Sequence, residues 1–219
     1  MPLDKHINFF ELQKAAENPG CPLCGIIAKR AEQYIDNTLF EHISDRTFRA
    51  NYREAGGFCS FHSRGLESFR DGLAVAILGR DILEERILAF DRGRPWTPKG
   101  RCPVCVEQDH IEEEYLSFLA GSDGGGKEEE ELRKIITASD GLCAPHYAKL
   151  LFTPKGKPRR LPVWLRDFHE TKFRDLKRRI DQFIELSAYG RQEEFQRLTE
   201  KDQLVWKELA LVLRGTINN

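Results

Sequence analysis

The chain has 219 residues, of which 40% are hydrophobic and 32% charged, and its formal net charge is −1. This composition is typical of a soluble globular protein rich in amphipathic helix, and the near-zero charge excludes a general attraction to nucleic acid or to membranes. The first residues lack the basic start and apolar core of a signal peptide, and no apolar run is long enough to span a bilayer. We therefore expect a cytoplasmic protein without membrane association.

Helical periodicity runs along the first half of the chain, and strand patterns are nearly absent. The pattern predicts a first helix from Asp4 to Glu17 and a second from Cys21 through Ile35. A third helix is predicted from Ser44 to Glu54, with Ser44 as its N-cap, and a fourth begins near Cys59. A longer fifth helix is predicted to turn one apolar face inward, made of Val75, Leu78, Ile82, Leu83 and Ile87.

A segment with two prolines and two glycines, Gly93 to Gly100, cannot continue a helix and predicts a connector. It divides the chain into a first helical repeat (1–92), a linker (93–100) and a second repeat (101–219). In the second repeat, helices are predicted after Cys102 and from Glu128 to Thr137. Two long helices are expected to close the chain, at Pro162 to Ala188 and at Glu193 to Leu213.

All six cysteines occur in two copies of one pattern. Each copy has a Cys-Pro-x-Cys motif and, after 34 intervening residues in the first copy and 37 in the second, the Cys of a Gly-x-Cys-x-x-His motif. The first copy supplies Cys21, Cys24, Cys59 and His62, and the second supplies Cys102, Cys105, Cys143 and His146. Three thiols and one imidazole are a ligand set of structural zinc sites. The sequence therefore predicts two zinc ions, one bound by each copy.

The spacing of these ligands suits a metal bound at helix ends. Two cysteines three residues apart lie on the same side of the first turn of a helix. Pro22 and Pro103 occupy the first helical position, where proline is tolerated because the N–H that it lacks would be unpaired anyway. The positive end of the helix stabilises a thiolate there. One metal would therefore connect the N-termini of two helices that are distant in sequence.

Three other interpretations of the cysteines remain open. Three cysteines and a histidine can hold an iron–sulfur cluster, although the usual spacings differ. A lone Cys-Pro-x-Cys resembles a redox motif, but no βαβ pattern surrounds either copy. Buried thiols without a metal are the remaining interpretation, which leaves the duplication unexplained.

The paired motifs resemble an uncharacterised bacterial family, found often in anaerobes and known only as a domain of unknown function. Its members share the paired Cys-Pro-x-Cys and Gly-x-Cys-x-x-His motifs, and they have segments similar to Leu39–Asp45 and Gly72–Leu78 of this chain. The resemblance covers most of the chain and implies no activity. Some relatives carry a transporter-binding-protein label, which does not fit a chain for which we expect no signal peptide.

A basic stripe is predicted between residues 155 and 179, a segment that contains ten Lys and Arg residues and only three acidic residues. On the predicted long helix, Arg174, Lys177 and Arg178 share a face away from the apolar positions. Such a surface can bind phosphates, and these three residues are the candidate anion-binding residues. The competing interpretation is a face that is only solvated, or paired with nearby acidic residues.

The sequence contains no phosphate loop, dinucleotide fingerprint or serine elbow, and no catalytic residue is predicted. We expect an all-α fold of two helical pseudo-repeats, each held by a Cys₃His metal site, with one shared core. The leading function is a non-enzymatic, zinc-stabilised interaction module whose partner is a protein that the sequence does not identify. The alternatives are nucleic-acid or anion binding through the 155–179 stripe, and an iron–sulfur electron carrier or redox sensor.

Overall fold

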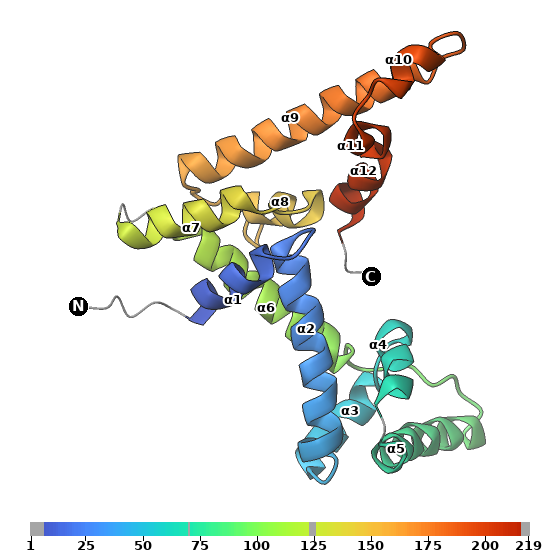
Figure 1. The fold of residues 1–219 in the computed structure, drawn as a ribbon. Helices are drawn as coiled ribbons and strands as arrows, with labels where there is room; N and C mark the ends of the chain where they lie inside the picture. Colours follow the sequence, from blue (N-terminus) through green and yellow to red (C-terminus); the bar gives the residue numbers. More distant parts are fainter. Residues whose placement is uncertain (1–6, 70, 123–125, 216–219) are drawn as a thin grey trace. The chain divides into compact units, whose positions relative to one another are not determined.

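A computed structural model describes residues 7–69, 71–122 and 126–215 of the chain (Figure 1). The predicted all-α fold is confirmed, since these residues form helices and no strand, apart from one isolated bridge between Phe152 and Pro158. The first half contains α1 (Ile7–Ala16), α2 (Pro22–Asn37), the π-helix η1 (Thr38–His42), α3 (Arg46–Ala55), α4 (Ser60–Arg64), the 3₁₀-helix η2 (Gly65–Ser68) and α5 (Gly72–Asp91). The second half contains α6 (Pro103–Ala120), α7 (Lys127–Ala138), α8 (Ala144–Leu151), α9 (Val163–Leu186), α10 (Gln192–Gln196), α11 (Glu200–Gln203) and α12 (Val205–Arg214).

The described chain divides into two compact units that do not follow the two repeats. Unit 1 contains the described residues up to Ile26 and those from Glu113 onward, and unit 2 contains those from Ile27 to Glu112. The boundaries therefore fall inside α2 and α6, whereas the sequence placed the division at the non-helical connector 93–100. Helices α2 and α6 therefore each contribute residues to both units.

Unit 1 is built around the second half of the chain. Helix α1 packs on α7, and α12 packs on both α8 and α9. The core includes fully buried aromatic and aliphatic residues, among them Phe9, Leu12, Tyr115, Leu119, Ile136 and Leu165. Arg179 of α9 is also buried, and it donates to Asp202 of α11 (2.7 Å) and to Glu208 of α12 (2.8 Å). This arginine therefore joins three helices of unit 1.

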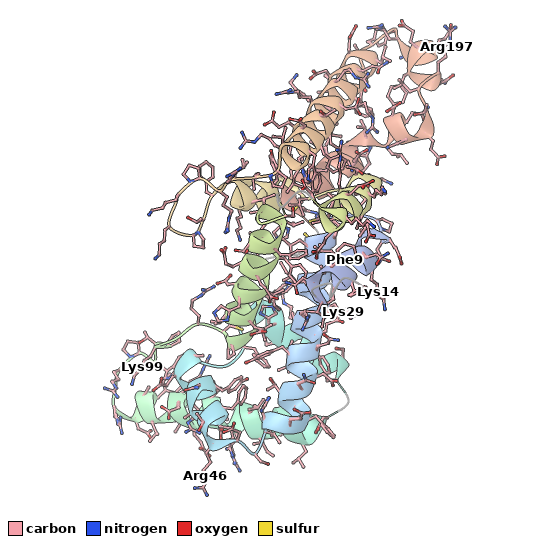
Figure 2. All side chains as sticks on the ribbon, turned by 90° about the vertical axis from the view of Figure 1, so that its left-hand side faces the viewer. Phe9, Lys14, Lys29, Arg46, Lys99 and Arg197 are labelled. Atoms are coloured by element: carbon pink, nitrogen blue, oxygen red, sulfur yellow. The ribbon has the colours of Figure 1, made fainter. Side chains whose placement is uncertain are left out.

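Unit 2 has its own core, which collects apolar residues from α2, η1, α3, α5 and the start of α6: Ala31, Ile35, Leu39, Tyr52, Phe58, Ala74, Leu78, Cys102 and Val104. The carboxylate of Asp81 is buried on α5 and accepts two hydrogen bonds from Arg49 of α3, at 2.7 and 2.5 Å. The adjacent guanidinium lowers the pKa of Asp81, so the carboxylate stays charged inside this core. Figure 2 shows charged side chains that project into solvent, among them Lys14, Arg46 and Arg197.

Three sequence predictions about the helices need correction or qualification. The predicted helix from Glu193 to Leu213 is in fact α10, α11 and α12, because Thr199 caps a new helix by accepting a hydrogen bond from the Asp202 N–H. Leu83 and Ile87 were expected to face inward but are exposed, since the buried face of α5 runs through Ala74, Leu78, Asp81 and Ala89. The N-cap of α3 is Asp45, not Ser44. The predicted start of the first helix at Asp4 lies outside the described residues.

No helix among the described residues has both the length and the apolar character needed to cross a membrane.

Candidate metal centres

Two groups of four side chains bring their donor atoms together within the described residues. Centre 1 consists of Cys21, Cys24, Cys143 and His146 in unit 1. Centre 2 consists of Cys59, His62, Cys102 and Cys105 in unit 2. In each centre the four ligand atoms lie within 4.8 Å of one another, as binding of a single metal ion requires. All eight side chains expected to bind metal thus gather into two Cys₃His groups.

The grouping differs from the one that the sequence suggested. Each centre combines the Cys-Pro-x-Cys motif of one copy with the Cys-x-x-His motif of the other. The predicted quartets Cys21–Cys24–Cys59–His62 and Cys102–Cys105–Cys143–His146 are therefore wrong.

The lengths of the helices explain why ligands from different copies meet. The 16 residues of α2 carry the chain about 24 Å from Cys21, and the 10 residues of α3 return it by only about 15 Å. The lengths of α6 (18 residues, about 27 Å) and α7 (12 residues, about 18 Å) differ in the same way.

The geometry of centre 1 is that of a small tetrahedron. The Nδ1 atom of His146 lies 3.3, 3.4 and 3.2 Å from the sulfurs of Cys21, Cys24 and Cys143. The Cys24 and Cys143 sulfurs are 3.8 Å apart. A tetrahedral ion with Zn–S bonds of about 2.3 Å places its sulfurs about 3.8 Å from each other. The donor atoms are therefore spaced as zinc would space them.

Centre 2 repeats this geometry. The Nδ1 atom of His62 lies 3.3, 3.5 and 3.4 Å from the sulfurs of Cys59, Cys102 and Cys105, and the Cys59 and Cys105 sulfurs are 3.8 Å apart. In both centres the histidine presents the same ring nitrogen, so the two sites have equivalent ligand sets. This equivalence follows from the identical Cys-x-x-His spacing on α4 and α8.

Helix N-termini position the ligands, as the sequence predicted. Helices α2 and α6 begin at the proline of each Cys-Pro-x-Cys motif, and Cys59 and Cys143 are the N-caps of α4 and α8 with extended backbones. The Cys59 thiol receives the backbone N–H groups of His62 and Phe61. Burial is the largest single influence and opposes ionisation of this thiol, but these donors, together with hydrogen bonds from the Cys105 and Cys102 thiols, outweigh it and lower its pKa. The local backbone thus favours a thiolate where a metal ligand is needed.

Burial and crowding oppose ionisation of two other thiols. Burial raises the pKa of Cys21, and the neighbouring Cys143 and Cys24 raise it further. Burial and the charges of nearby cysteines raise the pKa of Cys105 to about 12. A divalent cation reverses this balance because a coordinated thiol loses its proton. Ionised cysteines in the two centres are consequently stabilised by a bound cation, whereas a cluster of free thiolates there is unfavourable.

A buried polar side chain holds the loop before the third cysteine of each centre. In centre 1, the Leu142 N–H donates to Nε2 of His169 at 2.9 Å, and Nδ1 of His169 donates to the Leu165 carbonyl at 2.8 Å. In centre 2, the hydroxyl of Tyr52 receives the Phe58 N–H. Burial lowers the pKa of His169 to about 4, so this histidine is neutral. Sequence reasoning did not assign this role to His169, because no motif connects it to Cys143, which lies 26 positions earlier in the chain.

Asp140 is a second residue that sequence reasoning missed. Its carboxylate accepts the Gly20 N–H at 2.7 Å, directly before Cys21, and it lies 3.7 Å from the Lys172 ammonium. Asp140 therefore connects the two loops that carry the ligands of centre 1. Its position just before the Gly-x-Cys motif was the available signal, since Asp and Gly together favour a turn.

Gly215 closes centre 1 from the C-terminal side. Its φ is +72°, and a Cβ atom at this position would lie 3.1 Å from the Cys24 sulfur and 3.2 Å from the Cys143 sulfur. The backbone can approach the sulfurs this closely only because glycine has no side chain. The end of α12 thus contributes to the enclosure of the metal ligands.

The two centres differ in exposure. All four side chains of centre 1 are buried, whereas Cys59 and Cys105 of centre 2 are half-buried. In centre 2, the Nε2 atom of His62 is buried and has no hydrogen-bond partner among the described residues, although Gln108 lies beside the ring. Water and chelators therefore reach centre 2 more easily than centre 1.

The candidate anion-binding residues lie exposed on α9, and each pairs with an acidic residue of the same helix. Arg174 contacts Glu170 at 3.1 Å, Lys177 contacts Asp181 at 2.6 Å, and Arg178 contacts Asp175 at 2.7 Å. Earlier in the basic stripe, the Arg159 guanidinium donates to both carboxylate oxygens of Glu113 at 2.7 and 2.6 Å. The anion-binding role stays a prediction, since a phosphate would have to compete with these carboxylates.

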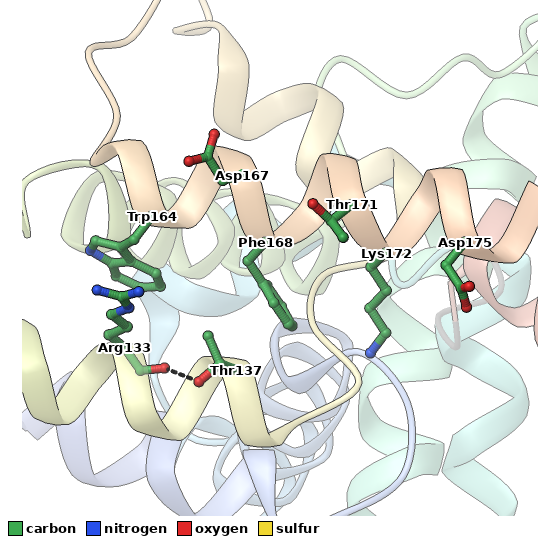
Figure 3. Close-up of a pocket in the computed structure, with 8 residues that line it drawn as sticks. All are labelled: Arg133, Thr137, Trp164, Asp167, Phe168, Thr171, Lys172 and Asp175. Atoms are coloured by element: carbon green, nitrogen blue, oxygen red, sulfur yellow. Dashed lines mark hydrogen bonds between the residues drawn. The ribbon is translucent and has the colours of Figure 1, made fainter.

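A shallow groove of about 360 Å³ lies between α7 and α9 in unit 1 (Figure 3). Trp164 and Phe168 form its apolar wall, and Lys172 reaches along it toward the Ser139 carbonyl, to which it donates at 3.2 Å. Burial lowers the pKa of Lys172. Because the ammonium already has partners in the loop that carries Cys143, we assign this lysine to the support of centre 1.

Comparison with known proteins adds one weak likeness. No family model and no solved structure matches the chain. The chain is 30% identical over 100 residues to an uncharacterised 23.9 kDa protein in the xynA 3′ region of Caldicellulosiruptor sp. (strain Rt8B.4). The match covers 43% of this chain and 49% of that protein, so it spans about half the length of the curated relative. This likeness to an uncharacterised protein agrees with the resemblance to an uncharacterised bacterial family.

Proposed function

We propose that the chain is a non-enzymatic interaction module in which two zinc ions hold the helices in place. The observation that carries the proposal is the completeness of each ligand set: three sulfurs and one imidazole nitrogen fill a tetrahedron and leave no position for a substrate. Closed sites of this kind serve structure, and their binding free energy contributes directly to folding. The cysteines form no disulfides, which fits a reducing compartment such as the cytosol.

The spacing of the ligands also supports zinc over an iron–sulfur cluster. The ligands of a [4Fe–4S] cluster each bind a different iron, and those of a [2Fe–2S] cluster bind as two pairs at opposite ends, so some donor atoms must lie farther apart than around a single ion. Here all four donors of each centre converge within 4.8 Å, which favours one ion per centre. Among single ions, zinc is the usual occupant of a tetrahedral Cys₃His site.

Metal analysis of protein purified without oxygen tests the proposal. We expect two zinc ions per chain, a colourless protein, and loss of helical signal in circular dichroism after strong chelation. Cys59→Ser should retain one zinc, and the neighbouring exposed substitution Ser60→Ala should retain both. A brown protein with several irons per chain, or a chain that folds fully without metal, would overturn the proposal.

A further inference from the structure

Helix α5 presents a second apolar face to solvent. Its buried face packs on the core of unit 2, but Leu73, Leu83, Ile87 and Phe90 are between 46% and 73% exposed. A helix at the surface of a soluble protein normally has one apolar stripe, and the opposite face is polar. Contiguous exposed apolar side chains of this kind mark interaction surfaces.

The spacing of this face is that of a helix pair. Steps of three and four residues alternate through six positions, Leu73, Ala76, Arg80, Leu83, Ile87 and Phe90, which we call the α5 seam. This alternation is the heptad pattern, in which side chains of one helix fit between those of a neighbouring helix. The seam runs along nearly the whole of α5 (Gly72–Asp91). It therefore suits another helix of similar length.

We propose that the α5 seam binds the α5 seam of a second copy of this chain, with the two helices antiparallel. This inference rests on the proposed role as an interaction module and names its partner. Antiparallel pairing sets Leu73 opposite the partner subunit's Phe90 and Ala76 opposite the partner subunit's Ile87. The one small side chain of the seam, Ala76, then lies opposite a large one and not opposite a second alanine, which avoids a void in the interface.

The charges of the seam select the same orientation. Arg80 lies near the midpoint and contacts Glu84 at 3.6 Å, and both side chains are more than 60% exposed. In an antiparallel pair, Arg80 faces Leu83 of the partner subunit and comes next to the partner subunit's Glu84, so opposite charges alternate across the two-fold axis. In a parallel pair, Arg80 would lie opposite the same arginine of the second copy, and two small Ala76 side chains would face each other and leave a void. Arg86 stays out of the seam because its guanidinium lies over the Trp96 ring, 5.1 Å from the centroid.

Sedimentation equilibrium of the zinc-loaded full chain tests the proposal. We expect a concentration-dependent dimer, and we expect Ile87→Glu to weaken association at least about tenfold, because it places a charge in the seam without a partner. The control Ile184→Glu substitutes an apolar residue of α9 that is also exposed, 64% against 46% for Ile87, and should leave the dimer intact. A wild-type chain that is monomeric up to about 100 μM, where weak but specific dimers are already populated, overturns the proposal. A dimer that survives Ile87→Glu overturns it as well.

Charge exchange tests the orientation. Arg80→Glu and Glu84→Arg should each weaken the dimer, and the double exchange should restore it, because the alternation of charge across the axis is regained. If the double variant associates no better than either single variant, the antiparallel register is wrong. Zinc content is measured on the same samples, so a monomer with two zinc ions refutes the α5 pairing alone, and a chain without zinc refutes the proposed function.

Discussion

His169 shows how one buried side chain makes stability depend on pH. Its pKa is lowered to about 4 by burial, while the ordinary value is about 6.5, so protonation favours the unfolded chain. The stability that neutral His169 contributes is complete above pH 6.5 and is lost as the pH falls toward 4. The linkage amounts to at most about 3 kcal/mol.

We expect His169→Gln to flatten the pH dependence of stability. Glutamine can still accept the Leu142 N–H but does not titrate. The test is urea unfolding at constant free zinc between pH 7.5 and 5.5, compared with the native chain. Loss of zinc at low pH affects both proteins alike, so the difference between the two curves reports His169. Parallel curves for the two proteins would show that His169 does not carry the proposed linkage.

Gly215 tests how closely the backbone must approach centre 1. Gly215→Ala brings a methyl group within about 3 Å of two sulfurs and also strains a positive φ, so we expect a loss of about 2 kcal/mol. Zinc should also leave centre 1 faster, which a coloured chelator measures. Gly190→Ala is the control, because Gly190 has a similar φ of +88° with nothing within 4 Å of the added atom. Equal zinc release from the two variants would mean that Gly215 does not enclose the site.

At the scale of elements, Arg179 connects the C-terminal helices through charged hydrogen bonds. The short α10 and α11 bury no residue of their own, and Arg179 joins α9 to α11 and α12. Its side chain is 9% exposed, while its carboxylate partners are 26% and 30% exposed. Removal of the arginine leaves two acidic groups that water only partly reaches.

We therefore predict that Arg179→Met costs about 2 kcal/mol, the scale of charged hydrogen bonds lost from a partly buried site. Arg178→Met, one position earlier, should cost less than about 0.5 kcal/mol because its pair with Asp175 is exposed. Urea unfolding of both variants at constant zinc measures the contrast. Similar losses in the two variants would show that the α9 network does not stabilise unit 1.

At the scale of the whole molecule, the exchanged grouping of ligands gives a sharp prediction. Cys24→Ser combined with Cys143→Ser alters centre 1 alone, so one zinc should remain in centre 2. Cys24→Ser combined with Cys59→Ser alters both centres, so little zinc should remain. If each centre used the ligands of one repeat, the first pair would lose both ions and the second pair only one. Metal content after dialysis against a weak chelator decides between these groupings.

The sequence alone was sufficient for the features that depend on local spacing. Periodicity predicted the helical class, and the Cys-Pro-x-Cys and Cys-x-x-His motifs predicted eight ligands at helix N-termini, because spacing within one helical turn fixes which side chains meet. The predicted end of the third helix at Glu54 is also close to the observed one, since α3 ends at Ala55, before Gly56 with its positive φ. Thr199 and Asp202 carried the signal of a new helix, but the apolar periodicity across them concealed it.

Only the tertiary structure decided how these local units combine. The repeats suggested that each binds its own metal, but the unequal lengths of α2 and α3, and of α6 and α7, bring together motifs from opposite halves of the sequence. His169, Asp140 and Gly215 act on centre 1 from positions that no motif joins to a cysteine. Periodicity identifies an apolar face, but it does not tell which of the two faces of α5 the core will cover. Local chemistry therefore determined the ligands and helices, and the paths of the helices in space determined their partners.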